Sequence, residues 1–299
     1  MDKVKIDIDL STVDKDNYDL AQKLLNESII INIINTQDID KNAIYKNPYP
    51  FLEYYNSIKD CIKCEGLLYC KKQFKGMCDC INQDLDIYLR PCKYKINDIK
   101  KYSYKKNIII NYMTDNFKDV SLSTSLIDRD NKNQMLVLTK LSAWIQNPAF
   151  PGYFIGGPCG TGKTHLLCSI INDLAIQNYR TAYIYTIDFV IKMREKMLNK
   201  DSYYQELERI KNVDILAFDD IGAEKMTEWA RDELFMPILN YRMENKLITF
   251  FTSNESISSL SSKISNKDND DVAKTRFIER IKTLSIELTL DGKSKRVIN

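Results

Sequence analysis

The chain has 299 residues, which is enough for one full α/β domain and a smaller second one. Its 43 Lys and Arg residues against 41 Asp and Glu give a net charge of +2, so no global basic field points to nucleic acid and any DNA contact must be local. No apolar run approaches a membrane span, and the first residues mix acids into a stretch that a secretory signal needs to be apolar, so we expect a cytoplasmic protein without a membrane partner.

The first sixty residues are predicted to be helical. Leu20, Leu24, Leu25 and Ile29 recur at the three- and four-residue spacing of one helix face. A second apolar segment follows at 45–58 and has prolines near its start. These segments lead directly into a stretch that is crowded with cysteine.

Six of the eight cysteines lie between positions 61 and 92, which marks a separate unit. Clustered thiols in a cytoplasmic chain bind metal more often than they form disulfides. Zinc takes four tetrahedral ligands, and the only histidine is His165, so the sequence predicts an all-cysteine zinc site. The predicted ligands are Cys61, Cys64, Cys70 and Cys78, with Cys80 and Cys92 as alternatives for the fourth. The alternative interpretation is a set of reduced, partly buried structural cysteines.

Three regions are expected along the chain. Residues 1–95 form the helical, cysteine-rich domain, 96–133 a linker and 134–299 an α/β domain. The linker is rich in Lys, Asn, Asp and Ser. Its lysines are interpreted as solvated rather than as DNA contacts: Lys100, Lys101, Lys105 and Lys106.

From residue 134 onward, strand and helix patterns alternate, which predicts a parallel sheet with helices on both faces. A helix is expected through Trp144 and Ile145, before the first strand. The sheet is expected to have five strands, at 152–156, 181–186, 213–219, 247–253 and 284–290. Helices are expected near 164–178, 187–198, 203–211 and 227–245, and a polar insertion at 261–271 resembles a flexible loop.

A complete phosphate-binding loop lies between the first strand and the helix that follows it. Residues 157–164 read Gly-Pro-Cys-Gly-Thr-Gly-Lys-Thr, in the strand–loop–helix context that the motif requires. The glycines let backbone N–H groups surround phosphate oxygens at the positive end of the helix dipole. Lys163 is expected to hold the β- and γ-phosphates of ATP, and Thr164 to ligate Mg²⁺. The predicted nucleotide-binding residues are Gly157, Pro158, Cys159, Gly160, Thr161, Gly162, Lys163, Thr164, His165 and Asp219.

Two acidic residues follow the third predicted strand. The buried apolar run at 213–218 ends in Asp219 and Asp220, about fifty residues after the phosphate loop. We expect Asp219 to hold Mg²⁺ and Asp220 to polarise the water that attacks the γ-phosphate. The next strand ends at Asn254, whose amide is expected to orient that water or to contact the γ-phosphate.

Four further motifs accompany these residues. They are Asp-Asp-Ile-Gly-Ala-Glu at 219–224, Trp-x-Arg-Asp-Glu at 229–233, Ile-Leu-Asn-Tyr-Arg-Met at 238–243 and Thr-Phe-Phe-Thr-Ser-Asn at 249–254. Together they resemble the AAA+ domain of the bacterial replicative helicase loaders of the DnaI type, relatives of DnaC. The resemblance covers 135–299, and the cysteine-rich region with its helical preface is similar to the zinc-binding amino-terminal domain of the same family.

The resemblance implies a P-loop AAA+ fold without a C-terminal lid, preceded by a small helical and zinc-binding domain. Asn254 matches the position called sensor 1 in the family. Arg280 matches its arginine finger, which reaches the ATP of a neighbouring subunit, and Arg276, one helical turn earlier, is the competing candidate. Asp220 stands where many AAA+ enzymes have glutamate, and its shorter side chain predicts slow hydrolysis.

The function implied by the resemblance is ATP-dependent loading of a DnaB-type replicative helicase onto single-stranded DNA during initiation of replication. The amino-terminal domain would bind the helicase, and the loaders would self-associate through their ATP sites and meet other primosome or initiator proteins. The implied cofactors are ATP or ADP, Mg²⁺ and Zn²⁺. DNA contact is assigned to the AAA+ faces, with Lys192, Arg194 and Lys196 as candidates that a solvated helix face explains equally well.

Two other classes of function remain open at the level of the sequence. A transposition-helper ATPase of the IstB type shares the AAA+ core and would bind duplex DNA, although the cysteine-rich preface argues against it. A nonhydrolysing nucleotide-binding adaptor would release no phosphate even with DNA and a partner present. A redox role for the cysteines predicts a reduced protein without zinc.

Overall fold

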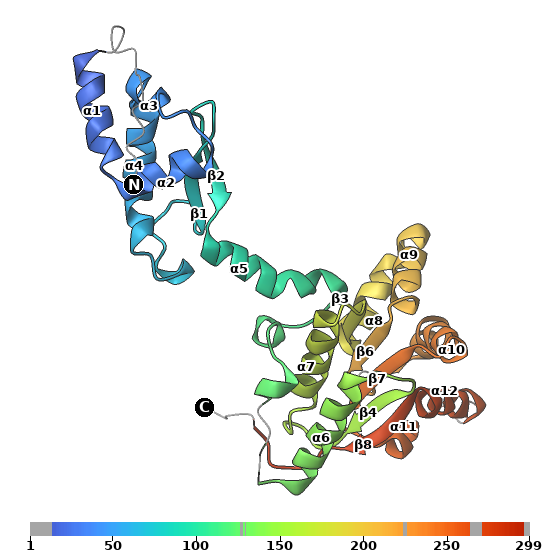
Figure 1. Ribbon diagram of the computed structural model, residues 1–299. Helices are drawn as coiled ribbons and strands as arrows, with labels where there is room; N and C mark the ends of the chain where they lie inside the picture. Colours follow the sequence, from blue (N-terminus) through green and yellow to red (C-terminus); the bar gives the residue numbers. More distant parts are fainter. Residues whose placement is uncertain (1–13, 126–127, 129, 224–225, 264–270, 296–299) are drawn as a thin grey trace. The chain divides into compact units, whose positions relative to one another are not determined.

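The computed structural model describes residues 14–125, 128, 130–223, 226–263 and 271–295. The chain divides into two compact units, Met1–Ser103 and Tyr104–Asn299, which Figure 1 shows in blue to green and in green to red. Among the described residues, no helix is both long and apolar enough to cross a membrane. Each unit has its own hydrophobic core and is therefore considered separately.

The first unit begins with four helices. They are α1 (Lys15–Leu25), α2 (Ser28–Thr36), α3 (Ala43–Lys46) and α4 (Tyr49–Ile62). The predicted helical character is thus confirmed from Lys15 onward, but the segment predicted at 45–58 divides between α3 and α4. The division falls at Pro48, which caps α4, while Pro50 lies in the first turn, where a missing N–H costs nothing.

A two-stranded antiparallel sheet packs on the fourth helix. Strands β1 (Met77–Ile81) and β2 (Ile87–Pro91) follow a short 3₁₀ turn at Leu67–Tyr69, and α5 (Lys93–Tyr102) ends the unit. Phe51 and Tyr54 of α4 share one core with Cys80 and Ile81 of β1. The cysteine-rich segment is therefore built onto the helices rather than separate from them.

The second unit is built on one parallel sheet. Its strands are β3 (Ile108–Asn111), β4 (Gly152–Gly156), β5 (Thr181–Tyr185), β6 (Ile215–Asp219), β7 (Ile248–Ser253) and β8 (Ser285–Thr289). They lie in the order β3-β5-β6-β7-β4-β8, and every neighbouring pair is parallel. Because β4, β6 and β7 are neighbours, their carboxyl ends bring the phosphate loop, the two acids and the sensor strand to one edge.

The sheet has six strands, so the predicted count of five is wrong. The sixth strand is β3, an edge strand that pairs only with β5 and lies inside the segment predicted as a linker. The same segment also contains 3₁₀ turns at Ser103–Asn107, Asp115–Phe117 and Leu122–Thr124. A four-residue strand flanked by polar residues carries too little periodicity to be distinguished from a loop.

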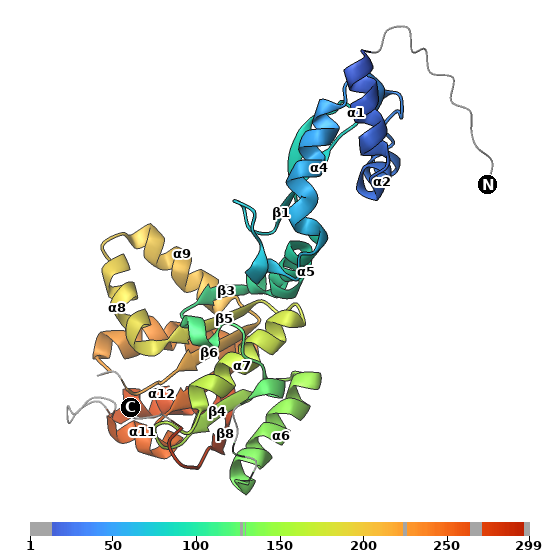
Figure 2. The same ribbon diagram turned by 90° about the vertical axis from the view of Figure 1, so that its left-hand side faces the viewer.

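Helices cover both faces of the sheet, as the alternating pattern predicts. Figure 2 shows α6 (Lys132–Gln146) and α7 (Lys163–Ile176) on one face, where they share a core with Ile155 and Ala217. The other face carries α8 (Thr186–Lys196), α9 (Lys200–Lys211), a π-helical segment (Ala230–Phe235), α10 (Met236–Glu244), α11 (Ile257–Lys263) and α12 (Asp271–Leu284). Of the predicted insertion at 261–271, residues 264–270 lie outside the described residues, Ser261–Lys263 ends α11 and Asp271 begins α12.

A fully buried arginine ties α10 to the sheet. The Arg242 guanidinium donates to the carbonyl oxygens of Lys211, Val213, Asp214 and Ile248 at 2.6–3.3 Å and to the hydroxyl of Thr249 at 2.9 Å. Burial lowers the pKa of Arg242 to about 9, which the nearby Asp214 partly offsets. These five bonds satisfy the donors of the guanidinium. Within the motif at 238–243, Arg242 therefore has a structural role and not a catalytic one.

Candidate nucleotide-binding site

The phosphate loop joins β4 to α7 in a conformation that depends on glycine. Gly160 and Gly162 have φ of +82° and +105°, a region that costs residues with a β-carbon about 1 kcal/mol or more. Helix α7 begins at Lys163 immediately after them, so its amino terminus, with the positive end of its dipole, faces the loop. This is the arrangement that binds a phosphate anion.

Lys163 reaches back over the loop that precedes it. Its ammonium donates to the carbonyl oxygens of Gly157 and Pro158 at 2.8 and 2.9 Å and to Oδ1 of Asn254 at 2.9 Å. The side chain is only 7% exposed. The cation is therefore held at the phosphate loop and is linked directly to the end of β7.

Asp219, at the end of β6, is 2% exposed and accepts hydrogen bonds from three hydroxyl groups. Thr164 donates to its two carboxylate oxygens at 3.0 and 3.3 Å, Tyr183 donates at 2.7 Å, and Thr252 donates to Oδ1. Burial, with Asp219 beside it, raises the pKa of Tyr183, so the phenol stays protonated and remains a donor. Carboxylate and hydroxyl oxygens are the ligands that Mg²⁺ accepts, so this donor set fits the predicted magnesium site.

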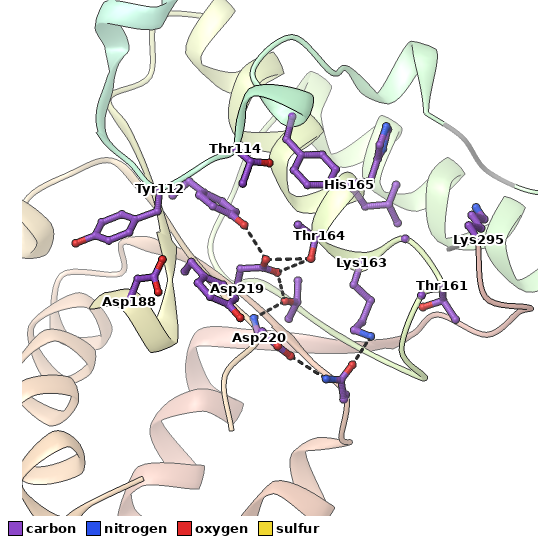
Figure 3. A pocket seen from close by; sticks show the side chains of 18 residues that line it. Tyr112, Thr114, Thr161, Lys163, Thr164, His165, Asp188, Asp219, Asp220 and Lys295 are labelled. Atoms are coloured by element: carbon purple, nitrogen blue, oxygen red, sulfur yellow. Dashed lines mark hydrogen bonds between the residues drawn. The ribbon is translucent and has the colours of Figure 1, made fainter. Parts of the chain in front are cut away.

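Asp220 has an unusual backbone conformation, with φ of +58°. Its N–H donates to the Thr252 hydroxyl at 2.8 Å, and its Oδ1 accepts from Nδ2 of Asn254 at 2.9 Å. The Asn254 amide thus lies between Lys163 and Asp220, as the dashed lines in Figure 3 show. The sensor strand therefore fixes both the cation and the acid that were predicted to act on the γ-phosphate.

These residues open onto a cavity of about 530 Å³. Nine of the predicted site residues line it: Gly160, Thr161, Gly162, Lys163, Thr164, His165, Asp219, Asp220 and Asn254. Gly157, Pro158 and Cys159 belong to the same loop but are not among its lining residues, and Cys159 is exposed. The structure thus brings together residues that are nearly one hundred positions apart in the sequence.

Sequence reasoning missed nine of the residues that line the cavity. They are Tyr112, Thr114, Phe117, Leu166, Tyr183, Tyr185, Asp188, Thr252 and Lys295. Three of them come from the segment predicted as a linker, and Lys295 follows the last strand. For Thr252, one signal was present, because a threonine two positions before Asn254 shares its strand face.

The segment after β3 forms the aromatic side of the cavity. The ring of Phe117 meets His165 edge to face, with centroids 6.2 Å apart. Nδ2 of Asn172 on α7 donates to the carbonyl oxygens of Phe117 and Val120 at 3.1 and 2.8 Å, which fixes the segment on that helix. Burial lowers the pKa of His165, and Lys295 adds to this, so His165 is a neutral ring at pH 7.

The two candidate arginine fingers both lie on α12. Nε of Arg280 donates to Oδ1 of Asn240 on α10 at 2.9 Å, and Arg280 is partly buried, whereas Arg276 is exposed. Neither residue lines the cavity of its own chain. A role toward a neighbouring subunit therefore stays a prediction.

The predicted zinc ligands lie around the end of α4 and the start of β1. Cys61, Cys64 and Cys70 are partly buried and Cys78 is buried, and the N–H of Gly76 donates to Sγ of Cys70 at 3.4 Å. Burial raises the pKa of Cys61, and the thiols of Cys78, Cys64 and Cys70 are close enough to contribute. Among the described residues, however, no group of three or more Cys, His, Asp or Glu side chains is arranged to hold a metal ion.

The two alternative ligands have different surroundings. Cys80 is fully buried in the core that α4 and β1 share, whereas Cys92 is partly buried and caps α5. Cys78 pairs with Arg90 across the two strands, so Cys92, two residues beyond Arg90, lies diagonally beside it on the same sheet face. Both Cys92 and Cys80 therefore lie near Cys78, and Cys80 in addition belongs to the apolar core.

Two known replicative helicase loaders and one solved structure are similar to this chain. DnaI of Bacillus subtilis, a replicative helicase loader, is 29% identical over 274 residues, which cover 88% of this chain and 86% of DnaI. DnaC of Escherichia coli, also a replicative helicase loader, is 27% identical over 131 residues, which cover 42% of this chain and 52% of DnaC. A crystal structure of DnaI matches with a TM-score of 0.55 and 28% identity over 66% of this chain and all of that one.

The predicted resemblance to replicative helicase loaders of the DnaI type is confirmed by these relatives. The parallel α/β sheet with its phosphate loop agrees with the predicted AAA+ fold. In addition, the family described as the bacterial DnaA ATPase domain matches residues 118–275, which is more than half of the chain. The chain belongs to the family of bacterial DnaA ATPase domains.

Proposed function

We propose that this chain is an ATP-dependent loader that places a DnaB-type replicative helicase on single-stranded DNA during initiation of replication. The observation that carries the proposal is the extent of the similarity to DnaI. The similarity covers 88% of the chain, whereas the unit Tyr104–Asn299 makes up only about two thirds of the chain. The similarity therefore extends through much of the amino-terminal unit, beyond the part that ATPases of many functions share.

ATP and Mg²⁺ are the ligands that the site fits. Loop N–H groups and Lys163 would hold the phosphates, Thr164 and Asp219 would hold the ion, and the ion would neutralise charge on the transferred phosphoryl group. Asp220 would orient the attacking water, and Asn254 would keep that acid and Lys163 in register. The products are ADP and phosphate. The role of each residue is tested by the rate at which a variant lacking its side chain releases phosphate.

The amino-terminal unit is proposed to bind the helicase. Its domain would comprise 1–95 and carry a zinc ion on Cys61, Cys64, Cys70 and Cys78. Four thiolates suit zinc, and the proximity of these cysteines supports the assignment. Because this unit has its own core, its binding to the helicase does not require the nucleotide site.

Self-association is proposed to run through Arg280, which would reach the γ-phosphate bound by the next subunit. DNA contact is assigned to the ATPase unit without naming residues. Each candidate on α8 has a partner within the chain: Lys192 lies 5.1 Å from the ring centre of Tyr112, Arg194 5.4 Å from that of Trp229, and Lys196 3.3 Å from Glu206. These contacts account for the three cations.

The test is co-purification with the cognate replicative helicase in ATP and Mg²⁺. Wild type is compared with Lys163→Ala and with a shortened chain that starts at Tyr104. A defined complex with wild type that the shortened chain does not form supports the loader and its amino-terminal docking site. If no form binds the helicase, and wild type instead binds duplex DNA together with a transposase, the proposal is wrong and the transposition-helper function replaces it.

A further inference from the structure

The segment after β8 runs along the phosphate loop. The N–H of Leu290 donates to the carbonyl oxygen of Gly156 at 2.7 Å, and the N–H of Lys295 donates to that of Gly160 at 2.9 Å. Two backbone hydrogen bonds, whose donors are five residues apart, therefore attach the segment to the chain between Gly156 and Gly160. Residues 290–295 therefore lie along the phosphate loop, and Lys295 at their end lines the cavity.

This segment lies so close to the loop that Gly157 and Gly160 could not carry a side chain without a clash. A β-carbon on Gly157 would lie 2.2 Å from the carbonyl oxygen of Leu290, and one on Gly160 would lie 2.2 Å from Oγ of Ser294. Both distances are far inside van der Waals contact. The two glycines belong to the phosphate-binding motif. Their lack of a β-carbon also makes room for the segment after β8.

The segment is held from its other side by the amino terminus of α6. Asn133 donates through Nδ2 to the carbonyl oxygen of Thr289 at 3.0 Å and accepts at Oδ1 from the N–H of Asp291 at 2.9 Å. Gln134, 1% exposed, donates to the carbonyl oxygen of Asp291 at 2.8 Å, and Asn131 does so at 3.3 Å. Four hydrogen bonds thus fix the path of the segment before it reaches the loop.

This path brings the Lys295 side chain to the cavity. Lys295 is among the lining residues, and its Nζ lies 3.7 Å from the position of a β-carbon on Gly162. It is also close enough to His165 to lower the pKa of that ring, in addition to the effect of burial. Figure 3 shows Lys295 and Lys163 on different sides of the loop, with Lys163 directed to Asn254.

We propose that Lys295 is a second phosphate-binding cation of this site, supplied by the carboxyl-terminal segment on the side of Gly162 and His165. The inference rests on the proposed binding of nucleotide in this cavity. Lys163 serves the end of the site next to Asn254 and Asp220, so Lys295 serves the phosphates nearer to His165, which ADP and ATP both carry. Lys295 is therefore expected to contribute to affinity for both nucleotides and not to the cleavage step.

The test is the affinity of the full chain for ADP and ATP with Mg²⁺, measured by calorimetry. Lys295→Ala is expected to weaken both nucleotides by about three- to tenfold, the scale of one partly exposed charge contact, and Lys295→Arg to retain affinity. Lys293→Ala is the matched control, because Lys293 is an exposed lysine of the same segment that does not line the cavity. The deficit of Lys295→Ala should shrink as KCl is raised, because screening weakens the contact in wild type.

A second variant tests whether the hydrogen bonds from α6 position Lys295, and leaves the charge of Lys295 in place. Asn133→Ala removes two of the bonds that hold the segment, at a residue outside the cavity. It should weaken ADP binding in wild type but have no further effect in the Lys295→Ala background, as a double-mutant cycle would show. Wild type that binds neither nucleotide overturns the proposed function, whereas wild type that binds while Lys295→Ala and Lys293→Ala bind equally well overturns this inference alone.

Discussion

The Thr252 hydroxyl donates to the Asp219 carboxylate from the neighbouring strand, at a position that is 1% exposed. The same oxygen accepts the N–H of Asp220 at 2.8 Å, so one side chain of β7 orients both Asp219 at the end of β6 and Asp220 directly after it. Its single hydrogen and its lone pairs are both used, and neither bond can be replaced by water at this depth. The relation between the two strands is thus part of the catalytic geometry.

Removal of that hydroxyl should separate catalysis from binding. Thr252→Val keeps the shape of the side chain but leaves the Asp220 N–H without its partner, at a cost of about 1–3 kcal/mol. Phosphate release should fall at least about tenfold, while ADP binding without Mg²⁺ stays close to wild type. Thr252→Ser restores the hydroxyl and should recover most of the rate. Equal rates for the valine and serine variants would refute a positioning role.

Tyr183 is expected to set the affinity for the metal ion. Tyr183→Phe removes the 2.7 Å hydrogen bond to Asp219 and leaves the ring in place. The carboxylate then loses one of the donors that fix it, so a titration of ATPase activity with Mg²⁺ should show a half-saturating concentration several-fold higher. Tyr204→Phe, at an exposed tyrosine, is the control and should leave the titration unchanged.

Arg242 should be among the side chains whose loss destabilises the ATPase unit most. Arg242→Met removes the guanidinium that donates to four carbonyl oxygens from a fully buried position, so urea denaturation should show a loss of about 3 kcal/mol or more. Arg180→Met is the comparison, because Arg180 also bonds to Asn212 and Asp214 but is mostly exposed. That change should cost under about 1 kcal/mol. Similar losses for the two variants would contradict the role given to burial.

Stability should fall as the pH drops through 6.5, because of the single histidine. Burial lowers the pKa of folded His165 below its ordinary 6.5, so the unfolded chain takes up a proton that the folded chain does not. The free energy of unfolding therefore decreases with falling pH in this window. Urea midpoints measured between pH 7.5 and 5.5 should show this slope in wild type and a flatter one in His165→Asn. Parallel slopes would assign the pH dependence to other groups.

Metal analysis of the reduced full chain tests the zinc domain. One zinc per chain is expected, with Cys61→Ser lowering it and Cys159→Ser, at an exposed thiol of the phosphate loop, leaving it unchanged. Cys78→Ser, Cys80→Ser and Cys92→Ser then decide the fourth ligand. Reduced protein without zinc would contradict the site and leave the cysteines as packing residues.

The ATPase fold was predictable where its signals are local and regular. The five predicted strands coincide with β4 to β8 within two residues at each end, because apolar runs bounded by helices define them. The edge strand β3 could not be predicted, because four residues among lysines and asparagines show no periodicity. Likewise, one helix was predicted where a π-helical segment precedes α10, a difference in winding that composition does not encode.

Within the site, the sequence predicted the residues that carry charge in known motifs and missed those that position them. Asp219 and Lys163 are recognisable because phosphate chemistry fixes their spacing. Tyr183 and Lys295 have no such pattern. Tyr183 becomes a partner of Asp219 through the pairing of β5 with β6, whereas Lys295 reaches the cavity because hydrogen bonds from α6 fix the path of its segment. Both relations exist only in three dimensions.

The left-handed backbone at Asp220 explains why this acid is short. Of the residues with a β-carbon, aspartate and asparagine adopt positive φ most readily, because their small polar side chains avoid the clash that longer ones meet. A glutamate at this position would gain reach but would distort the turn that Thr252 and Asn254 hold. We therefore expect the main chain to limit the rate of hydrolysis, so that Asp220→Glu alone would not raise it.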